Sequence, residues 1–186
     1  MIRVWDPLVR AFHWSLALSF AIAWLSAEGW EDLHDWVGYA AGALVLARVA
    51  WGFLGAPYAR FAQFVCSPRT VIAYLKAIAT ASEARFVGHN PAGGAMIVAL
   101  LIAMAATATT GWMLTLDAFW GSIWAQRLHS LVAHSLPPLV LAHLAGVALA
   151  SLRHRENLVR AMIFGDKRAP EAGDVALSQE AGPSGS

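Results

Sequence analysis

The sequence predicts an all-α membrane protein, a bundle of four transmembrane helices with both termini in the cytoplasm. Three observations predict this fold. The 186 residues are 58% hydrophobic and only 13% charged, with a mean hydropathy of +0.53, whereas soluble domains are about 25% charged. Four stretches with few charges each approach the roughly 20 residues that a membrane-spanning helix needs. The basic residues, finally, gather on one side of these stretches.

The predicted spans cover residues 10–27, 36–54, 92–116 and 130–152. Tryptophans cluster near their ends, as interfacial aromatic residues do. Asn90-Pro91 directly precedes the third span and predicts a helix start, with Asn as the N-cap and Pro in the first turn. In the loop at 55–90, residues 68–81 are expected to form an interfacial helix. We expect one membrane domain at 1–168 and a disordered tail at 169–186, which is rich in Gly, Ala, Ser and Pro.

Charge sets the predicted orientation. Arg127 is the exception to a pattern that places every other Lys and Arg before the first span, between the second and third, or after the fourth. The opposite loops carry the acidic residues Glu28, Glu31, Asp32, Asp35 and Asp117. Positively charged loops stay in the cytoplasm. We therefore expect both termini and the loop at 55–90 in the cytoplasm, in a multi-pass protein of the bacterial inner membrane.

Two histidines, His129 and His143, lie 14 residues apart in one apolar stretch. Fourteen helical residues advance about 21 Å and end only about 40° from where they began. The two imidazoles would therefore face nearly the same way at different depths in the membrane. Pro137-Pro138 lies between them, and proline inside a helix predicts a kink that would change this shared direction.

Four histidines pair by depth in the predicted topology. His13 enters the first span from the cytoplasm, and His34 enters the second from the periplasm. The fourth span runs inward, so His129 lies near the periplasm and His143 near the cytoplasm. His13 then matches His143 in depth, and His34 matches His129.

This pairing points to two hemes. Ionisable groups at membrane depth are costly and mark function by default, and two imidazoles can hold a heme iron from both sides, leaving no open coordination position. Small residues follow each histidine at helical spacing, which would leave room for a flat porphyrin. They are Ala17 and Ala21, Gly38 and Gly42, Ala133, and Gly146 and Ala150. The alternative is that the small residues serve close helix packing and that the histidines are hydrogen-bonding partners between helices.

Other polar residues have weaker indications. Arg48 lies 14 residues after His34 on the same helix face; it either snorkels to the lipid headgroups or neutralises a propionate of the cytoplasmic heme. His134 is turned away from the paired histidines and is expected to face outward or a neighbouring span. His89 is expected at the cytoplasmic surface as a capping or solvated residue, with a heme propionate or a quinone as the alternative contact. His154 is expected in solvent.

Five segments together resemble the bacterial cytochrome b561 family, which includes the b-type cytochrome subunits of nickel–iron hydrogenases. They are VWDPLVRAFHW (4–14), LHDWVGYAAGALVLARVAWGFLG (33–55), GHNPAGG (88–94), LHSLVAHSLPPLVLAHLAGV (128–147) and HRENLVRAMIFGDKR (154–168). The resemblance implies four membrane helices and two b hemes, with axial ligands at His13, His34, His129 and His143. The Pro137-Pro138 pair departs from the family pattern.

The function expected is transmembrane electron transfer between the quinone pool and a partner redox protein, such as a periplasmic cytochrome c or a dehydrogenase subunit. The chain would then be a respiratory-chain cytochrome subunit of an oxidoreductase. Quinone oxidoreductase activity of its own stays open, with His89 and Asp35 as candidates for proton handling. The alternative is a heme-poor membrane anchor, which would lack a b-type reduced-minus-oxidised spectrum. A transporter would need acidic residues within the spans, where only Asp35 is marginal. No nucleic-acid partner is expected, and a homodimer stays open.

Overall fold

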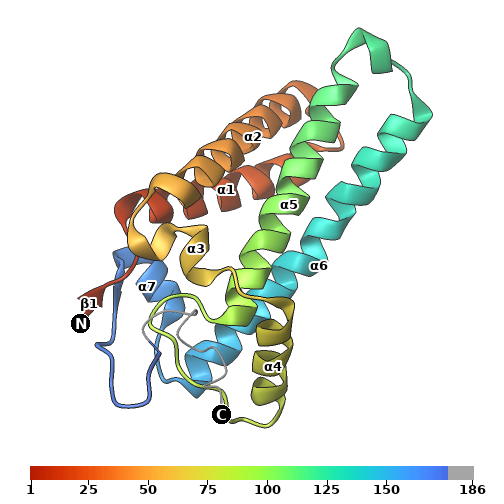
Figure 1. Cartoon of the computed structure of the whole chain (residues 1–186). Coiled ribbons are helices and arrows are strands. Elements are labelled where there is room, and N and C mark those ends of the chain that lie inside the picture. The colour runs from red at the N-terminus through yellow and green to blue at the C-terminus, as the bar shows by residue number, and fades with distance from the viewer. Residues whose placement is uncertain (176–186) are drawn as a thin grey trace. The chain divides into compact units, whose positions relative to one another are not determined.

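The computed structural model describes residues 1–175, and within them the chain is almost entirely helical (Figure 1). Four long helices carry the fold: α1 (Pro7–Ser26), α2 (Glu31–Leu54), α5 (Pro91–Leu114) and α6 (Ile123–Arg153). The shorter elements are β1 (Ile2–Arg3), η1 (Pro57–Ala59), α3 (Phe61–Phe64), α4 (Pro68–Ala79), η2 (Asp117–Phe119), α7 (Leu158–Phe164) and β2 (Asp166–Lys167). No other regular element occurs in residues 1–175.

The four long helices of the described region are long and apolar enough to cross a membrane. They confirm the four predicted spans, and α4 lies where the short helix at 68–81 was expected. Two of them begin earlier than predicted. α2 starts at Glu31 rather than residue 36, and α6 starts at Ile123 rather than residue 130. Charge-poor stretches mark only the apolar part of a helix, whereas Glu31 and Asp32 suit the positive dipole of a helix N-terminus. His34 and His129 are consequently inside helices rather than at their edges.

Side chains that cap the helix ends explain where several helices begin. Asn90 accepts a hydrogen bond from the backbone N–H of Gly93 at 2.7 Å, which confirms the predicted start of α5. Asp6 accepts from the N–H of Val9 at 2.9 Å at the start of α1. Ser67 does the same for α4, where it accepts from Thr70 at 3.2 Å. Each cap satisfies an N–H that has no partner within its own helix.

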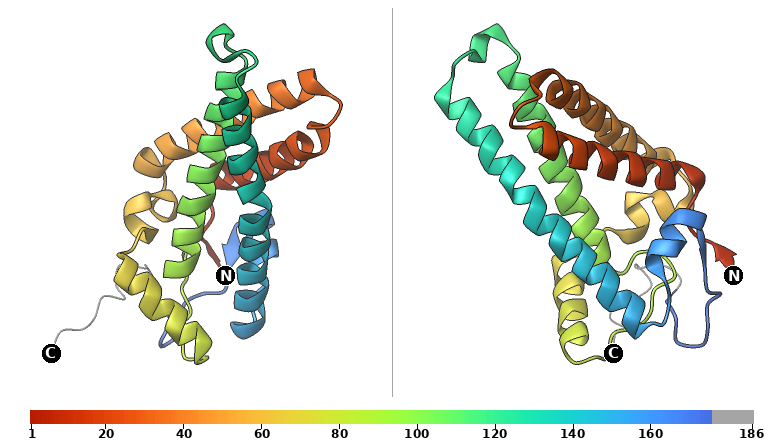
Figure 2. Two further views of the ribbon diagram at one scale, coloured as in Figure 1. Left: turned by 90° about the vertical axis from the view of Figure 1, so that its right-hand side faces the viewer. Right: turned by 180° about the vertical axis from the view of Figure 1, so that it is seen from behind.

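The chain divides into two compact units, described here one at a time. The helical unit consists of Ala11–Ala50 and Ala99–Leu141. Within it, α1 runs beside α2 and α5 beside α6 (Figure 2). Its buried core joins α2, α5 and α6 through Ala41, Val45, Ala103, Met104 and Leu136, with Leu16 and Phe20 of α1 packed against them. The other large apolar side chains of these helices, such as Leu18 and Leu131, point outward, as expected where lipid rather than protein surrounds a helix.

Helix α6 continues without a break through Pro137 and Pro138. A proline has no N–H to donate to the carbonyl four residues earlier, so the carbonyls of Ala133 and His134 lose their usual helical donors. Membrane helices tolerate such losses when nearby groups compensate. One turn earlier, the Ser135 hydroxyl donates to the carbonyl of Val132 at 2.6 Å.

The second unit, called here the loop unit, consists of residues 1–10, 51–98 and 142–186, of which those up to 175 are described. Three distant segments meet in it. β1 pairs antiparallel with β2, Ile2 opposite Lys167. Phe86 forms a parallel bridge with Val175. Of the tail for which disorder was predicted, residues 176–186 lie outside the described part, whereas Asp174 and Val175 make these specific contacts.

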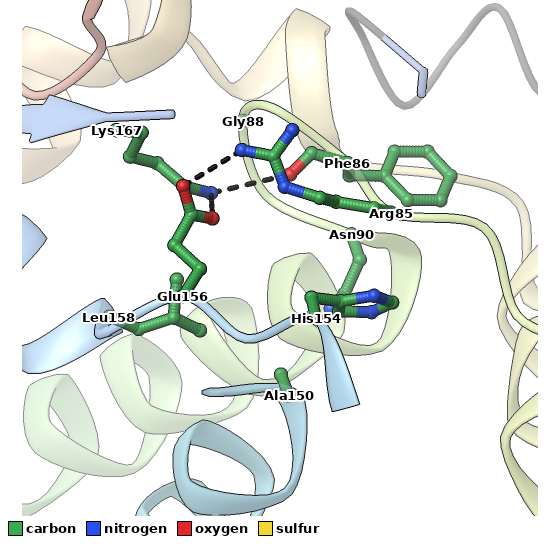
Figure 3. A pocket seen from close by; sticks show the side chains of 9 residues that line it. All are labelled: Arg85, Phe86, Gly88, Asn90, Ala150, His154, Glu156, Leu158 and Lys167. Atoms are coloured by element: carbon green, nitrogen blue, oxygen red, sulfur yellow. Dashed lines mark hydrogen bonds and ion pairs between the residues drawn. The ribbon is translucent and has the colours of Figure 1, made fainter. Parts of the chain in front are cut away.

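A buried charge cluster joins these segments, and the sequence analysis did not anticipate it. Arg85 donates to a carboxylate oxygen of Glu156 at 2.8 Å and forms a second ion pair with Asp174. Lys167 lies 3.4 Å from Glu156 and donates to the carbonyl of Val87 at 2.8 Å. The side chains of Arg85, Glu156 and Lys167 are each less than 10% exposed. Figure 3 shows them converging around a small cavity.

Glu156 is the hub of this cluster. Burial alone would raise the pKa of its carboxyl group, but the hydrogen bond from Arg85 and the charge of Lys167 hold that pKa below its ordinary value. A carboxyl group with a lowered pKa in the folded state stabilises the fold above its unfolded pKa of about 4.3. This contribution is lost as the pH falls through the folded-state pKa.

We therefore expect Glu156→Gln to loosen the loop unit. Removing one partner of a buried ion pair leaves the others uncompensated and costs about 3 kcal/mol. Hydrogen–deuterium exchange of the full chain in detergent at pH 7 should show roughly hundredfold faster exchange at residues 83–88 and 165–168. The matched control is Glu171→Gln, because Glu171 is 62% exposed in its ion pair with Arg168 and should have little effect. Equal exchange in the two variants would contradict a stabilising role for the cluster.

Candidate functional site

Two of the predicted histidines come together in the helical unit. His34 lies in the first turns of α2 and His129 in the first turns of α6. Their ring centroids are 6.2 Å apart and the rings are perpendicular, at 90°. Both side chains are half-buried. The structure thus brings together the pair that the sequence analysis matched by depth at the outer side of the membrane.

Hydrogen bonds fix one nitrogen of each imidazole. Nδ1 of His34 lies 2.9 Å from the backbone carbonyl of Ala23 in α1. Nδ1 of His129 lies 3.0 Å from the hydroxyl oxygen of Thr110 in α5. A carbonyl can only accept, so Nδ1 of His34 carries the proton and Nε2 keeps its lone pair. Histidines that bind metals are held in this way, with the second nitrogen oriented by a hydrogen bond.

A cavity with an empty volume of about 570 Å³ lies beside the two imidazoles. All four long helices line it, through Ser19, Phe20, Ala23, His34, Asp35, Gly38, Tyr39, Ala41, Met104, Thr107, Ala108, Gly111, Trp112, Thr115, His129 and Leu136. Its lining is mainly apolar. Gly38, one turn after His34, faces open space that a side chain there would enter. The small residue predicted at this position is therefore next to unfilled volume.

These dimensions fit a heme held by two histidines. Metal–imidazole bonds of about 2 Å on each side, plus roughly 1 Å from each nitrogen to its ring centre, give a centroid separation of about 6 Å. Within residues 1–175, no group of three or more His, Cys, Asp or Glu side chains could hold a metal ion by itself. A heme iron asks for only two ligands from the protein here, because the porphyrin supplies the other four.

The second predicted pair is divided between the two units. His13 belongs to the helical unit, where it is half-buried and its ring meets that of Trp14 edge-on, with centroids 5.1 Å apart. His143 belongs to the loop unit and is also half-buried. Their pairing stays a prediction from sequence. Arg48 lies in the helical unit with only 8% of its surface exposed.

The remaining histidines have local partners. His134 is exposed, as expected; its Nδ1 lies 2.7 Å from the carbonyl of Ser130, and its ring packs edge-on against Trp24 of α1. In the loop unit, His89 lies between Trp5 and Phe64, at 4.4 and 5.0 Å between ring centroids. It is therefore packed against aromatic rings rather than solvated.

His154, expected in solvent, is half-buried beside the charge cluster. Burial lowers the pKa of its imidazole. The small cavity in Figure 3 is lined by Arg85, Asn90, His154, Glu156 and Lys167 among others. It belongs to the loop unit, as the cavity beside His34 and His129 belongs to the helical unit.

Sequence reasoning missed the contribution of α5 to the site. This helix contains no histidine, yet Thr110 contacts His129, and a Cβ atom added to the neighbouring Gly111 would lie 3.2 Å from the same imidazole. The available signal was a hydroxyl followed by a glycine inside a strongly apolar span. That pattern is common in membrane helices, where it serves close packing, so it singled out neither residue.

Comparison with known proteins agrees with this site. The family model described as prokaryotic cytochrome b561 matches residues 4–165, a range that contains all four long helices and all seven histidines. No curated protein and no solved structure matches the chain. Since the matched range covers most of the sequence, the chain belongs to the prokaryotic cytochrome b561 family, whose members are membrane proteins that transfer electrons through b-type heme.

Proposed function

We propose that this protein transfers electrons across the bacterial inner membrane through two b hemes, each held by two histidines. The observation that carries the proposal is the His34–His129 pair, with ring centroids 6.2 Å apart beside a cavity of about 570 Å³. A b heme with two imidazole ligands supplies a one-electron couple and has no open position for oxygen or substrate.

The residues around the outer pair serve orientation and exclusion of water. Ala23 and Thr110 hold the Nδ1 atoms of His34 and His129, which leaves the Nε2 atoms to act as ligands. Phe20, Met104 and Leu136 supply apolar walls to the cavity. A rigid, dry environment keeps both oxidation states in one geometry, which favours electron transfer over ligand exchange.

We assign the second pair to His13 and His143 on the strength of their matching depth in the sequence. Arg48 is proposed to neutralise a propionate of this inner heme, because a guanidinium with 8% exposure in an apolar helix needs an anionic partner or a polar neighbour. The two proposed hemes then lie about 20 Å apart along the bilayer normal. The proposed partners are the quinone pool and a redox protein, a cytochrome c or a dehydrogenase subunit.

The proposed orientation places both termini and the loop between α2 and α5 in the cytoplasm, since these segments carry nearly all Lys and Arg residues. Because Cys66 is the only cysteine, a Cys66→Ser chain can carry single reporter cysteines. Ser82→Cys should resist a membrane-impermeant maleimide in intact spheroplasts and react in inverted vesicles. Ala118→Cys should show the reverse, and both positions are exposed. Labelling of Ser82→Cys from outside would contradict the orientation.

Ligand assignment is tested by heme content. His34→Ala and His129→Ala should each lose one of the two hemes, because one remaining imidazole cannot hold a b heme with bis-histidine character. The matched control is His134→Ala, on the same helix as His129 but already bonded to Ser130. A pyridine hemochrome assay per mole of purified chain gives the count. A heme lost in His134→Ala and kept in His129→Ala would overturn the assignment.

Double variants test which histidines share a heme. If His34 and His129 hold one heme, the His34→Ala/His129→Ala chain should still bind one heme, as should His13→Ala/His143→Ala. The mixed variant His13→Ala/His34→Ala should bind none, because it disrupts both sites. The hemochrome count and the amplitude of the reduced-minus-oxidised spectrum report the result. One heme in the mixed variant, and none in the two matched variants, would contradict the pairing.

A further inference from the structure

The hydroxyl of Thr110 lies between the backbone of its own helix and the imidazole of His129. Its oxygen is 2.8 Å from the carbonyl of Ala106 and 3.1 Å from that of Thr107, and it is 3.0 Å from Nδ1 of His129. Thr110 is only 8% exposed. Back-bonding of this kind to the carbonyl four residues earlier is usual for threonine in a helix and holds the hydroxyl in one rotamer.

The direction of the contact follows from counting protons. A hydroxyl has one hydrogen and two acceptor lone pairs. With that hydrogen directed at the carbonyl of Ala106, the oxygen can only accept from His129, so Nδ1 carries the imidazole proton. Nε2 then keeps its lone pair, which is the form of histidine that binds a metal.

Gly111 completes the contact. A Cβ atom at this position would lie 3.2 Å from Cε1 of His129, and the next nearest imidazole atom would be Nδ1 at 3.6 Å. A side chain there would push the ring away from Thr110. The Thr110-Gly111 pair therefore provides both the acceptor and the room that the ring needs to reach it.

We propose that Thr110 is a positioning residue that fixes His129 and tunes the reduction potential of the heme that His34 and His129 hold. The inference rests on the proposed function and deepens it. It gives α5, a span without a histidine, a defined task at the redox site.

The two axial histidines differ in how they can be tuned. The partner of His34 is the main-chain carbonyl of Ala23, which no substitution removes. The partner of His129 is a side chain, which substitution can remove. An acceptor on Nδ1 makes an imidazole ligand more basic, and a more basic ligand favours the ferric state. Loss of the Thr110 hydroxyl should therefore raise the potential of this heme.

The experiment compares three variants of the full chain, purified with its hemes. Thr110→Val keeps the shape of the side chain and removes the acceptor. Thr110→Ser keeps the hydroxyl. Thr109→Val is the matched control, because Thr109 is an exposed residue of the same helix. Optical redox titration resolves the midpoint potential of each heme, and the potential absent from His129→Ala identifies the one concerned.

We expect Thr110→Val to increase the equilibrium constant for reduction of that heme severalfold to tenfold, a tenfold change being about 59 mV for one electron. Thr110→Ser should stay near the wild-type value, and Thr109→Val should not change it. Loss of the heme from Thr110→Val but not from Thr110→Ser would equally support a positioning role. An unchanged potential in Thr110→Val, or an equal shift in Thr110→Ser, would overturn the inference and leave the heme assignment standing. Two hemes in His129→Ala would instead overturn the proposed function itself.

Discussion

The site depends on one constraint: an imidazole inside an apolar span must have a partner for each of its nitrogens. A polar group buried without a hydrogen bond costs roughly 1–3 kcal/mol, so a histidine does not persist in a membrane helix without a reason. In the helical unit, His34 and His129 each place Nδ1 on an acceptor in a neighbouring helix, Ala23 in α1 and Thr110 in α5. Both helix pairs are thereby linked through the rings. An iron between the two Nε2 atoms would satisfy the second nitrogen of each ring at once.

The loop unit meets a different constraint, which is how to bury charge. Its cluster of Arg85, Glu156, Lys167 and Asp174 satisfies each charged group with an opposite charge or a carbonyl. Arg85 lies a few residues before the start of α5, and Glu156 follows the end of α6. The ion pair therefore ties together the chain segments that enter one long helix and leave the other. Buried pairs of this kind add little net stability but are costly to break, so they specify one arrangement of these segments.

Much of the fold was predictable because hydropathy and capping act locally. The four spans, the helix at Pro68–Ala79 and the start of α5 at Asn90-Pro91 all follow from residues close in sequence. The approach of His34 to His129 was predictable because membrane orientation gives each residue a depth, which is long-range information of a kind that soluble proteins lack. The contacts of Thr110 and Arg85 were not predictable, because a hydroxyl or a guanidinium does not reveal which of many distant acceptors it meets. Arg85 in particular counted only as a positive charge for orientation, although it is buried and paired with Glu156.

The most direct test of the account is the heme content and spin state of the purified wild-type chain. The account predicts two b hemes per chain by pyridine hemochrome, both low-spin in electron paramagnetic resonance of the oxidised protein, since two imidazole ligands leave no open position. A chain without heme would support a membrane anchor instead. A high-spin ferric signal from the intact chain would show an iron with an open position and would contradict the bis-histidine assignment.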